Sequence, residues 1–598
     1  MARRGGAVHV ATTRRHYKDQ VYETHLLRRS YRQDGKVKTE TLGNLSHLPA
    51  ETIELIRRSL KGETFVPASD AIDQTERNGL GENGFRILRS LPHGDAAAAA
   101  VMADRLGLWD VIGPAGRERD LVVGLVLARV CRPGSKLAAT RWWADSTAGT
   151  DLGITEASTD EVYAALDWLG GRKQAIEAAL AARHLSAGGR VLFDLSSSWM
   201  HGSACPLARF GHSRDGKRGK PQIEYGILAD QAGCPVAVEV FAGNTGDPTA
   251  FVAAVQTVRK RFGLTDITFV GDRGMITQAR IDALRELPGA DWVTALRAPQ
   301  IKALVESGAI QMSLFDTANL AEISHPDYPG ERLMVCRNPV LAEQRARTRE
   351  ALLQATEDRL TKLAATVAAG RLKDHTKIAV RAGRILAKHK MAKHFDLTVE
   401  QNVISWSRRT EAIEAEAATD GIYVVRTSLP PNGTTGIGAG QVVGVYKSLA
   451  QVEADFRSWK ATDLQLRPVY HWTEPRVRAH VLLCLLAGYL TWHLRRALAP
   501  ITFTDTDRTQ PWARVDPVAP ATASPTAKAK ATTKRTADGQ PVYSYQSLLA
   551  HLTTLTRNTC HLTGTSHEDV FDKLTEPTPT QRRAFELLGL KQPPTQLV

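Results

Sequence analysis

The sequence predicts an α/β protein whose core is a mixed sheet flanked by helices. Nearly continuous apolar runs occupy residues 190–198, 222–230 and 235–242, as is typical of strands that are buried on both faces. A segment with helical spacing follows at 248–262 and leads into another apolar run at 266–272. Short turns join antiparallel strands, whereas a helical crossover brings the next strand in parallel, so this order predicts a mixed sheet.

With 598 residues the chain is too long for one hydrophobic core, so we expect several domains. A run rich in Pro, Ala, Thr and Lys after about residue 500 has a composition typical of disorder. In chain order we expect a basic N-terminal hairpin region (1–65), a linker (66–92), an α-helical domain (93–187), the first part of the sheet core (188–299), an insertion domain (300–419), the second part of the core (420–498), a disordered linker (499–545) and a helical C-terminal region (546–598).

The N-terminal region is strongly basic, since residues 1–40 carry ten Arg or Lys against four acids. Residues 20–43 have the pattern of two strands around a Gln-Asp-Gly-Lys turn. Such a hairpin could lie against DNA phosphates; the alternative is an ordinary solvated hairpin. The basic residues that would face the phosphates are Arg28, Arg29, Arg32, Lys36 and Lys38.

A second basic surface is predicted in the insertion domain. About 180 residues lie between Asp272, at the end of the last apolar run of the first core part, and Glu453 in the second core part. This is far more than a crossover connection needs. Within the excess, the run KIAVRAGRILAKH has helical spacing and places four basic residues on one face: Lys377, Arg381, Arg384 and Lys388. That face could bind the DNA backbone; the alternative is a solvated helix face.

Two aspartates stand in strand-like surroundings. Asp194 lies inside the apolar run GRVLFDLSSSW, where an ionised carboxylate is costly unless it is paired or binds a metal. Asp272 ends the run DITFVGD, and open α/β sheets bind their ligands at the carboxyl ends of strands. Taken singly, an aspartate at a strand end is commonly a turn residue. The two together indicate a site at one edge of the sheet.

The run GVYKSLAQVEADFRSWK predicts a helix with a polar stripe. Steps of three and four residues keep Tyr446, Leu449, Glu453, Arg457 and Lys460 on one face. The carboxylate could bind a divalent metal, and the two cations could hold phosphate oxygens. An exposed helical glutamate is otherwise a solvated charge. Combined with the two aspartates, the stripe would complete a site for phosphodiester chemistry.

The order of strand Asp194, strand-end Asp272 and helical Glu453 resembles the DDE transposases of bacterial insertion sequences, whose catalytic core is RNase H-like. The segments GHSRDGKRGKPQIEYGIL, FAGNTGDPTAF and RPVYHWTEPRVRAH support the resemblance, which spans roughly residues 100–500. It implies an RNase H-like mixed sheet flanked by helices and interrupted by a large insertion domain. It also implies that the helical domain at 93–187 binds element ends or assembles protomers.

More narrowly, the helix resembles the Tyr-x2-Arg-x3-Glu-x6-Lys signature of the group around the family-four insertion sequences. Tyr446, Glu453 and Lys460 match this signature at its spacing, whereas Leu449 stands at the Arg position. The match implies that Tyr446, Arg457 and Lys460 position the end DNA. The departure at Leu449 removes one expected phosphate or end-DNA contact.

The resemblance implies a DNA transposase that binds terminal inverted repeats and target DNA. Asp194, Asp272 and Glu453 would hold two Mg²⁺ or Mn²⁺ ions at the scissile phosphate. Water would cleave at the element's end and the freed 3′-hydroxyl would attack target DNA, with no nucleotide cofactor. In the related group an aromatic residue of the insertion often holds a flipped base, for which Trp406 is the candidate. A homodimer on DNA is expected.

Two other functions remain compatible with these residues. The chain could be a metal-dependent nuclease on the same fold that cuts DNA without strand transfer. It could instead be a DNA-binding protein whose catalytic core is silent. Joined products on DNA that carries the native ends would indicate the transposase, cut products alone the nuclease, and retention without cutting the binding protein.

Composition indicates the binding partner and the cellular compartment of the protein. A net charge of +14 and a pI near 9.5 indicate a polyanionic partner, most simply nucleic acid. Six scattered cysteines without a Cys-x2-Cys pair predict a reducing cytosol, no disulfides and no zinc site. The apolar run HVLLCLLAGYLTWHL is shorter than a membrane span and predicts a buried core helix. We therefore expect a cytoplasmic, nucleoid-associated bacterial protein without a membrane partner.

Overall fold

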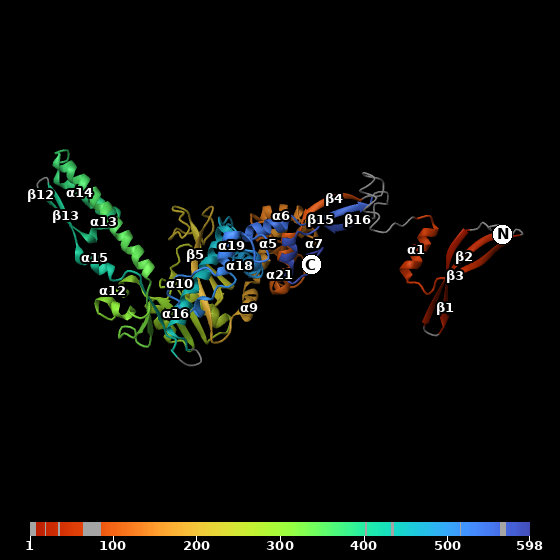
Figure 1. The fold of residues 1–598 in the computed structure, drawn as a ribbon, viewed down its shortest axis with the longest axis horizontal. Coiled ribbons are helices and arrows are strands. Elements are labelled where there is room, and N and C mark those ends of the chain that lie inside the picture. The colour runs from red at the N-terminus through yellow and green to blue at the C-terminus, as the bar shows by residue number, and fades with distance from the viewer. Residues whose placement is uncertain are drawn as a thin grey trace. The chain divides into compact units, whose positions relative to one another are not determined.

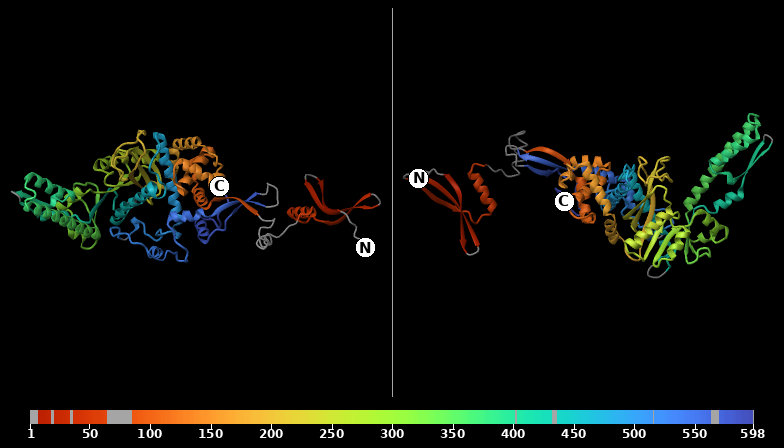
Figure 2. Two further views of the ribbon diagram at one scale, coloured as in Figure 1. Left: turned by 90° about the horizontal axis from the view of Figure 1, so that it is seen from above. Right: turned by 180° about the vertical axis from the view of Figure 1, so that it is seen from behind.

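The computed structural model describes residues 7–17, 20–33, 36–63, 85–400, 403–431, 436–514, 516–562 and 570–597. The chain forms two compact units (Figures 1 and 2). The first unit comprises Met1–Arg89 with Thr559–Asp572, and the second comprises Ser90–Asn558 with Lys573–Val598. Each unit is described by itself.

The first unit contains an antiparallel sheet of order β1-β2-β3, formed by β1 (Ala7–Tyr17), β2 (Gln20–Gln33) and β3 (Lys36–Asn44). The hairpin predicted at 20–43 is thereby confirmed as β2 and β3, although its turn residues 34–35 lie outside the described residues. The strand β1 and the helix α1 (Ala50–Leu60) were not predicted. Arg57 on α1 donates a hydrogen bond to the hydroxyl of Thr12 on β1, which attaches the helix to the sheet.

The C-terminal part of the linker predicted at 66–92 is a strand in the structure. Residues 66–84 lie outside the described residues, whereas β4 (Phe85–Pro92) is a strand. It belongs to a sheet of order β16-β15-β4 with β15 (Thr556–Leu562) and β16 (Val570–Leu574). The C-terminal region at 546–598 is therefore not wholly helical as expected. Its helices are α20 (Tyr545–Thr553) and α21 (Pro579–Leu587).

Seven helices fill the range predicted as a helical domain, and three of them, α3, α5 and α8, pack against the long helix α18 (Glu474–Ala497). Almost every residue of α18 from Val477 to Leu494 is buried, and the helix contacts both the helical domain and the sheet. It is long and apolar enough to cross a membrane, but its apolar window is mostly buried inside the protein, so the prediction of a core helix is confirmed. The seven helices are α3 (Gly94–Arg105), α4 (Leu108–Ile112), α5 (Arg117–Cys131), α6 (Lys136–Ala144), α7 (Thr147–Asp151), α8 (Thr159–Gly171) and α9 (Lys173–His184).

The core of the second unit is an eight-stranded mixed sheet of order β10-β11-β14-β9-β8-β5-β6-β7. Its centre is parallel, because β5 pairs with β8 and β8 with β9 in parallel, whereas the other neighbours are antiparallel. This mixed α/β architecture is consistent with the expected RNase H-like core. The strands are β5 (Gly189–Trp199), β6 (Gln222–Asp230), β7 (Pro235–Ala242), β8 (Ile267–Gly271), β9 (Ala290–Ala295), β10 (Leu320–Ile323), β11 (Arg332–Arg337) and β14 (Ile422–Thr427).

The crossover predicted at 248–262 is also present. The helix α10 (Asp247–Gln256) continues into a π-helical turn at Thr257–Arg261 and then leads to β8. Phe251 and Ala254 on its inner face are buried, and the Phe251 ring packs edge-on against Phe269 of β8. The alternation of apolar and polar residues at helical spacing thus places α10 on the sheet.

The insertion begins later than predicted. Its expected range of 300–419 includes β10 and β11, which belong to the core sheet because β11 pairs with β14. The separate part has its own hydrophobic core, in which Leu360 of α13 meets Ile378 of α14. Figure 1 shows α13 and α14 side by side with a two-stranded sheet. The elements are α13 (Pro339–Ala368), α14 (His375–Lys388), β12 (Phe395–Glu400), β13 (Val403–Arg408) and α15 (Thr410–Ala417).

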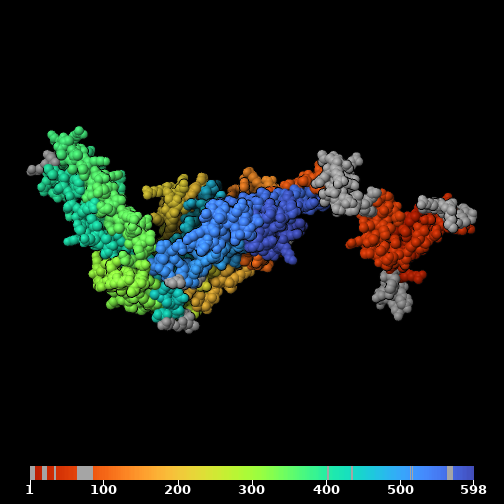
Figure 3. Space-filling view, in the orientation of Figure 1, coloured from red at the N-terminus to blue at the C-terminus, as the bar shows by residue number. Residues whose placement is uncertain are grey.

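The prediction of a disordered linker at 499–545 is wrong. This segment contains the helix α19 (Pro525–Thr533), and Figure 3 shows it in blue along the body of the second unit. The buried Lys530 donates hydrogen bonds to the carbonyl oxygens of Ala499 and Thr502, at 3.1 and 3.2 Å. A lysine that satisfies main-chain acceptors can order a segment with few apolar residues.

Candidate active site

Asp194 is held in the middle of the core sheet. It lies on β5, and its Oδ1 accepts a hydrogen bond of 2.8 Å from the backbone N–H of Leu195. Burial raises its pKa to about 7, the negative charges of Glu453 and Asp272 act in the same direction, and the Leu195 N–H and Arg214 oppose the shift. The charges of Glu453 and Asp272 thus influence the protonation of Asp194.

The strand register explains why Asp272 lies beside Asp194. The strands β5 and β8 are parallel neighbours with Phe193 opposite Gly271. The residues that follow these two are Asp194 and Asp272, so the two aspartates lie side by side. The backbone N–H of Met275 donates a 3.0 Å hydrogen bond to the carbonyl of Asp272, so the chain turns directly after it. The exposed Asp272 carboxylate therefore stands at the carboxyl end of β8, as the apolar run predicted.

Glu453 reaches the same place from a helix. It lies on α17 (Leu449–Arg457), which packs against β5. Asp194, Asp272 and Glu453 line one cavity of about 670 Å³. The structure therefore brings the three predicted carboxylates together, with Glu453 and Asp272 exposed to a ligand.

The predicted continuous helix is broken. Tyr446 lies on α16 (Ala439–Lys447), the chain bends at Ser448, and α17 ends in a π-helical turn at Ser458–Thr462 that carries Lys460. The Tyr446 hydroxyl nevertheless donates a 3.2 Å hydrogen bond to Asp272 Oδ1. Burial, followed by the negative charge of Asp272, raises the pKa of the Tyr446 hydroxyl, so it remains a donor. Leu449 is buried, in keeping with a packing role.

Lys460 lines the cavity but is already paired. Its Nζ donates a 2.9 Å hydrogen bond to Oδ1 of Asp215, a carboxylate with only 1% of its side chain exposed. Arg467 lies 2.5 Å from the same oxygen, and the backbone N–H of Trp199 donates to Oδ2 at 3.2 Å. The prediction that Lys460 contacts phosphate did not foresee this buried ion pair, because nothing in the sequence around Asp215 links it to the helix.

Besides Asp215, one more carboxylate of the cavity was missed. Asp247, the first residue of α10, also lines the cavity. Arg214 donates a 2.5 Å hydrogen bond to its Oδ1 and another to the carbonyl of Leu195, next to Asp194. A Cβ at Gly274 would lie 3.3 Å from Asp247 Oδ2 and 3.7 Å from Asp272 Oδ2, so a side chain there would occupy the space beside both carboxylates. An acid before Pro at a helix start would have been the available signal.

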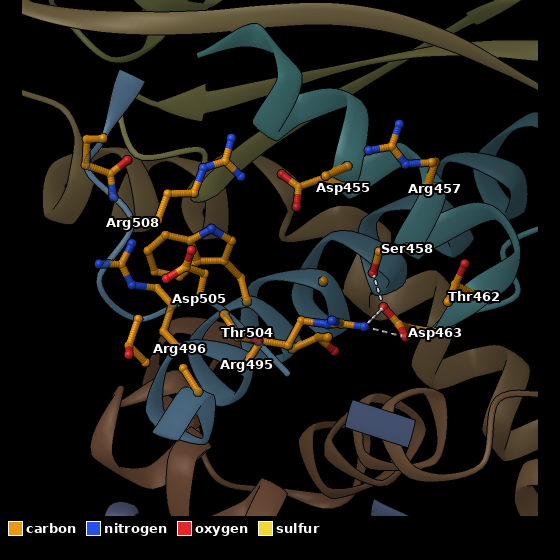
Figure 4. Close-up of a pocket in the computed structure, with 17 residues that line it drawn as sticks. Asp455, Arg457, Ser458, Thr462, Asp463, Arg495, Arg496, Thr504, Asp505 and Arg508 are labelled. Carbon is orange, nitrogen blue, oxygen red and sulfur yellow. Dashed lines mark hydrogen bonds and ion pairs between the residues drawn. The ribbon is translucent and has the colours of Figure 1, made fainter. Parts of the chain in front are cut away.

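Arg457 borders two cavities. It lines the cavity of the three acids and also a second pocket of about 610 Å³, shown in Figure 4. This second pocket contains further arginines, among them Arg496 and Arg508, and the carboxylates Asp455 and Asp505. The exposed guanidinium of Arg457 therefore lies between the cavity of the acids and a second pocket that is lined by both arginines and aspartates.

The other predicted DNA contacts lie outside this cavity. Along β2 successive side chains alternate between faces, so Arg29 points away from the face shared by Arg28 and Arg32, and Arg29 stands opposite Glu40 of β3. Trp406 lies on β13 and packs, half-buried, against the hydrophobic core of the insertion. The basic face of α14 is exposed and consists of Lys377, Arg381, Arg384 and Lys388.

Comparisons with known proteins identify two domains of the chain. Residues 10–70 match the N-terminal domain of IS1634 family transposases, and residues 196–490 match the transposase DDE domain. None of the curated proteins matches the chain. A solved structure described as a piggyBac transposase synaptic complex with hairpin DNA is 9% identical, covers 79% of this chain and 82% of its own, and has a TM-score of 0.34, which is too low to establish a shared fold. With the family's N-terminal domain followed by a DDE domain, the chain is a DDE transposase of the IS1634 family.

Proposed function

We propose that Asp194, Asp272 and Glu453 are the catalytic acids and that they bind two Mg²⁺ or Mn²⁺ ions for cleavage at the element's ends and strand transfer into target DNA. The observation that carries the proposal is the convergence of these carboxylates, from two parallel strands and one helix, on one cavity. When bound, the metal pair would activate the attacking oxygen and stabilise the leaving oxygen.

The donor set fits such a pair. Carboxylate oxygens are the ligands that hard divalent cations prefer, and Asp247 supplies a further carboxylate in the same cavity. The raised pKa of Asp194 fits as well, because burial and the negative charges of Glu453 and Asp272 disfavour its ionised form, which a bound cation would stabilise. Arg214 offsets part of the negative charge of Asp194.

The remaining polar residues would orient the acids and the DNA. The Tyr446 hydroxyl would hold Asp272 in one orientation through its hydrogen bond. The buried pair of Lys460 with Asp215 would fix the turn that ends the Glu453 helix. Arg457 would contact a phosphate next to the scissile bond, because its guanidinium is exposed at the cavity.

The wider features of the transposase are also proposals. We propose an RNase H-like core, the helix signature of the group around the family-four insertion sequences, and a homodimer on the terminal inverted repeats. The basic strands of the first unit and the basic face of α14 would bind DNA phosphates. The half-buried Trp406 is a poorer candidate for holding a flipped base than an exposed ring would be. We expect these reactions in the bacterial cytoplasm, at the nucleoid.

The test uses the full chain with Mg²⁺ and DNA that carries the ends of its own element. Wild type should give cleaved ends and joined products, and Asp272→Asn should give neither while it still binds the ends. Asp282→Asn is the matched control, because Asp282 is an exposed aspartate on α11 (Gln278–Arg285) outside the cavity. Cut products without joined products would refute strand transfer, and cleavage by Asp272→Asn would refute the assignment of the acids.

A further inference from the structure

A cluster of two histidines and a cysteine lies in the interior of the second unit. The ligand atoms of His184, Cys234 and His493 are all within 4.8 Å of one another. Cys234 Sγ lies 3.9 Å from His184 Nε2 and 3.8 Å from His493 Nε2. They come from the end of α9, the turn between β6 and β7, and α18. Three elements that are far apart in the sequence thus bring one thiol and two imidazoles, which are soft and borderline metal ligands, close together.

The spacing is close to that of a tetrahedral zinc site. Zinc binds thiolate sulfur at about 2.3 Å and histidine nitrogen at about 2.0–2.1 Å, which puts sulfur and nitrogen about 3.5 Å apart in a tetrahedron. The observed distances of 3.8 and 3.9 Å exceed this value by only a few tenths of an ångström. Movements of a few tenths of an ångström would therefore bring the sulfur to this distance from both histidine nitrogens.

The surroundings orient these ligands as a metal site requires. Asp230 Oδ2 lies 3.4 Å from His184 Nδ1, so the opposite nitrogen, Nε2, faces Cys234. Asp230 Oδ1 also accepts a 2.8 Å hydrogen bond from the backbone N–H of Cys234. A carboxylate behind a ligating histidine is the usual second contact of a zinc site. His184 Nε2 lies 3.0 Å from the Tyr489 hydroxyl, a hydrogen bond that metal binding would replace.

We propose that His184, Cys234 and His493 bind one Zn²⁺ ion, with water or the Tyr489 hydroxyl as the fourth ligand. Binding would release the thiol proton of Cys234 to solvent, because the thiolate is the ligand. The site is separate from the Mg²⁺ or Mn²⁺ site proposed above, whose ligands are oxygen atoms. It also revises the sequence-based expectation of no zinc site, since its ligands are dispersed along the chain.

The position of this site suggests what the ion would do. The turn that carries Cys234 packs against α17: a side chain at Gly233 would lie 2.7 Å from Gln451. Gln451 is two residues before Glu453 on the same helix. An ion that joins α9, this turn and α18 would therefore fix the surface on which the helix of Glu453 rests.

The experiment measures metal binding directly. The full chain, stripped of metal and kept reduced, is titrated with Co²⁺, whose thiolate charge-transfer absorption reports a cysteine ligand. We expect one ion per chain with this absorption, displaced by one equivalent of Zn²⁺, and its loss in Cys234→Ser. Cys484→Ser is the matched control, because Cys484 is a buried cysteine on α18 outside the cluster.

Two further variants separate this site from the catalytic one. Asp230→Asn should weaken Zn²⁺ binding by about 10- to 100-fold, as expected for the partner of a ligating histidine. Asp272→Asn should leave Zn²⁺ binding unchanged, so failure of the catalytic assignment would not affect the result. Absence of the thiolate absorption in the wild-type chain would overturn the proposal, and so would an unchanged absorption in a folded Cys234→Ser variant.

Discussion

The affinity of the DNA-free transposase for Mn²⁺ should rise steeply with pH. Burial raises the pKa of Asp194 to about 7, and Glu453 and Asp272 add to the shift. A metal binds the ionised carboxylate, so below this pKa a proton must leave first and the apparent affinity falls. From about pH 8 to about pH 5.5 the ionised fraction falls roughly 30-fold for a pKa near 7, but hardly at all for an ordinary aspartate.

The assay is a titration of the metal-free chain with Mn²⁺ at constant ionic strength, with the free ion followed by electron paramagnetic resonance. We expect the association constant to fall by about 30-fold over this range and to level off at higher pH. The matched control is Glu224→Gln, because burial also raises the pKa of Glu224, on the neighbouring strand β6, to about 7. An affinity that does not depend on pH, or a dependence that disappears in Glu224→Gln, would refute the role of Asp194.

Three further predictions concern other parts of the chain. Lys460→Ala should lower the free energy of unfolding by about 1–3 kcal/mol, because the buried Asp215 would lose one of its two cationic partners and keep Arg467 and the Trp199 N–H. Lys460→Arg should restore the stability, and unchanged thermal denaturation in Lys460→Ala would contradict the pairing. Replacing the basic face of α14 by alanines should reduce the salt dependence of DNA affinity, by about one unit of logarithmic slope for each phosphate that the variant no longer neutralises; an unchanged slope would assign this face to solvent. Deleting residues 1–62 should weaken binding to the element's ends in a mobility-shift assay, and equal affinity at matched salt would give this region another role.

The acids of the site can be predicted from local pattern, whereas their neighbours cannot. Asp194 interrupts an apolar run and Asp272 ends one, and these contexts are visible in the sequence. Asp215 and Asp247 stand in a polar loop and at a helix start, where acids are common. Only their hydrogen bonds with Lys460 and Arg214 distinguish them, and those bonds join residues that are far apart in the chain.

The same distinction holds for the fold. The strands around Asp194 are apolar throughout, so their bounds follow from composition. The strand β10 (Leu320–Ile323) is four residues long and none of it is fully buried, so its place in the core sheet depends on pairing with β11. Likewise, the order of residues 499–545 depends on a buried Lys530, whereas their composition alone resembles disorder.

The pairing of β11 with β14 has a consequence for how this transposase can change. These strands are antiparallel neighbours with Arg337 opposite Ile422, and the backbone N–H of Asn338 donates a 2.9 Å hydrogen bond to the carbonyl of Gly421. Gly421 has a φ of +74°, as a tight turn requires. The whole of α13 to α15 is therefore the loop of a single β-hairpin. A short turn should be able to replace that loop, or the loop of a relative should be able to take its place, while the strands keep their register. Evolution, or protein engineering, could then exchange one insertion for another without moving Asp194, Asp272 or Glu453.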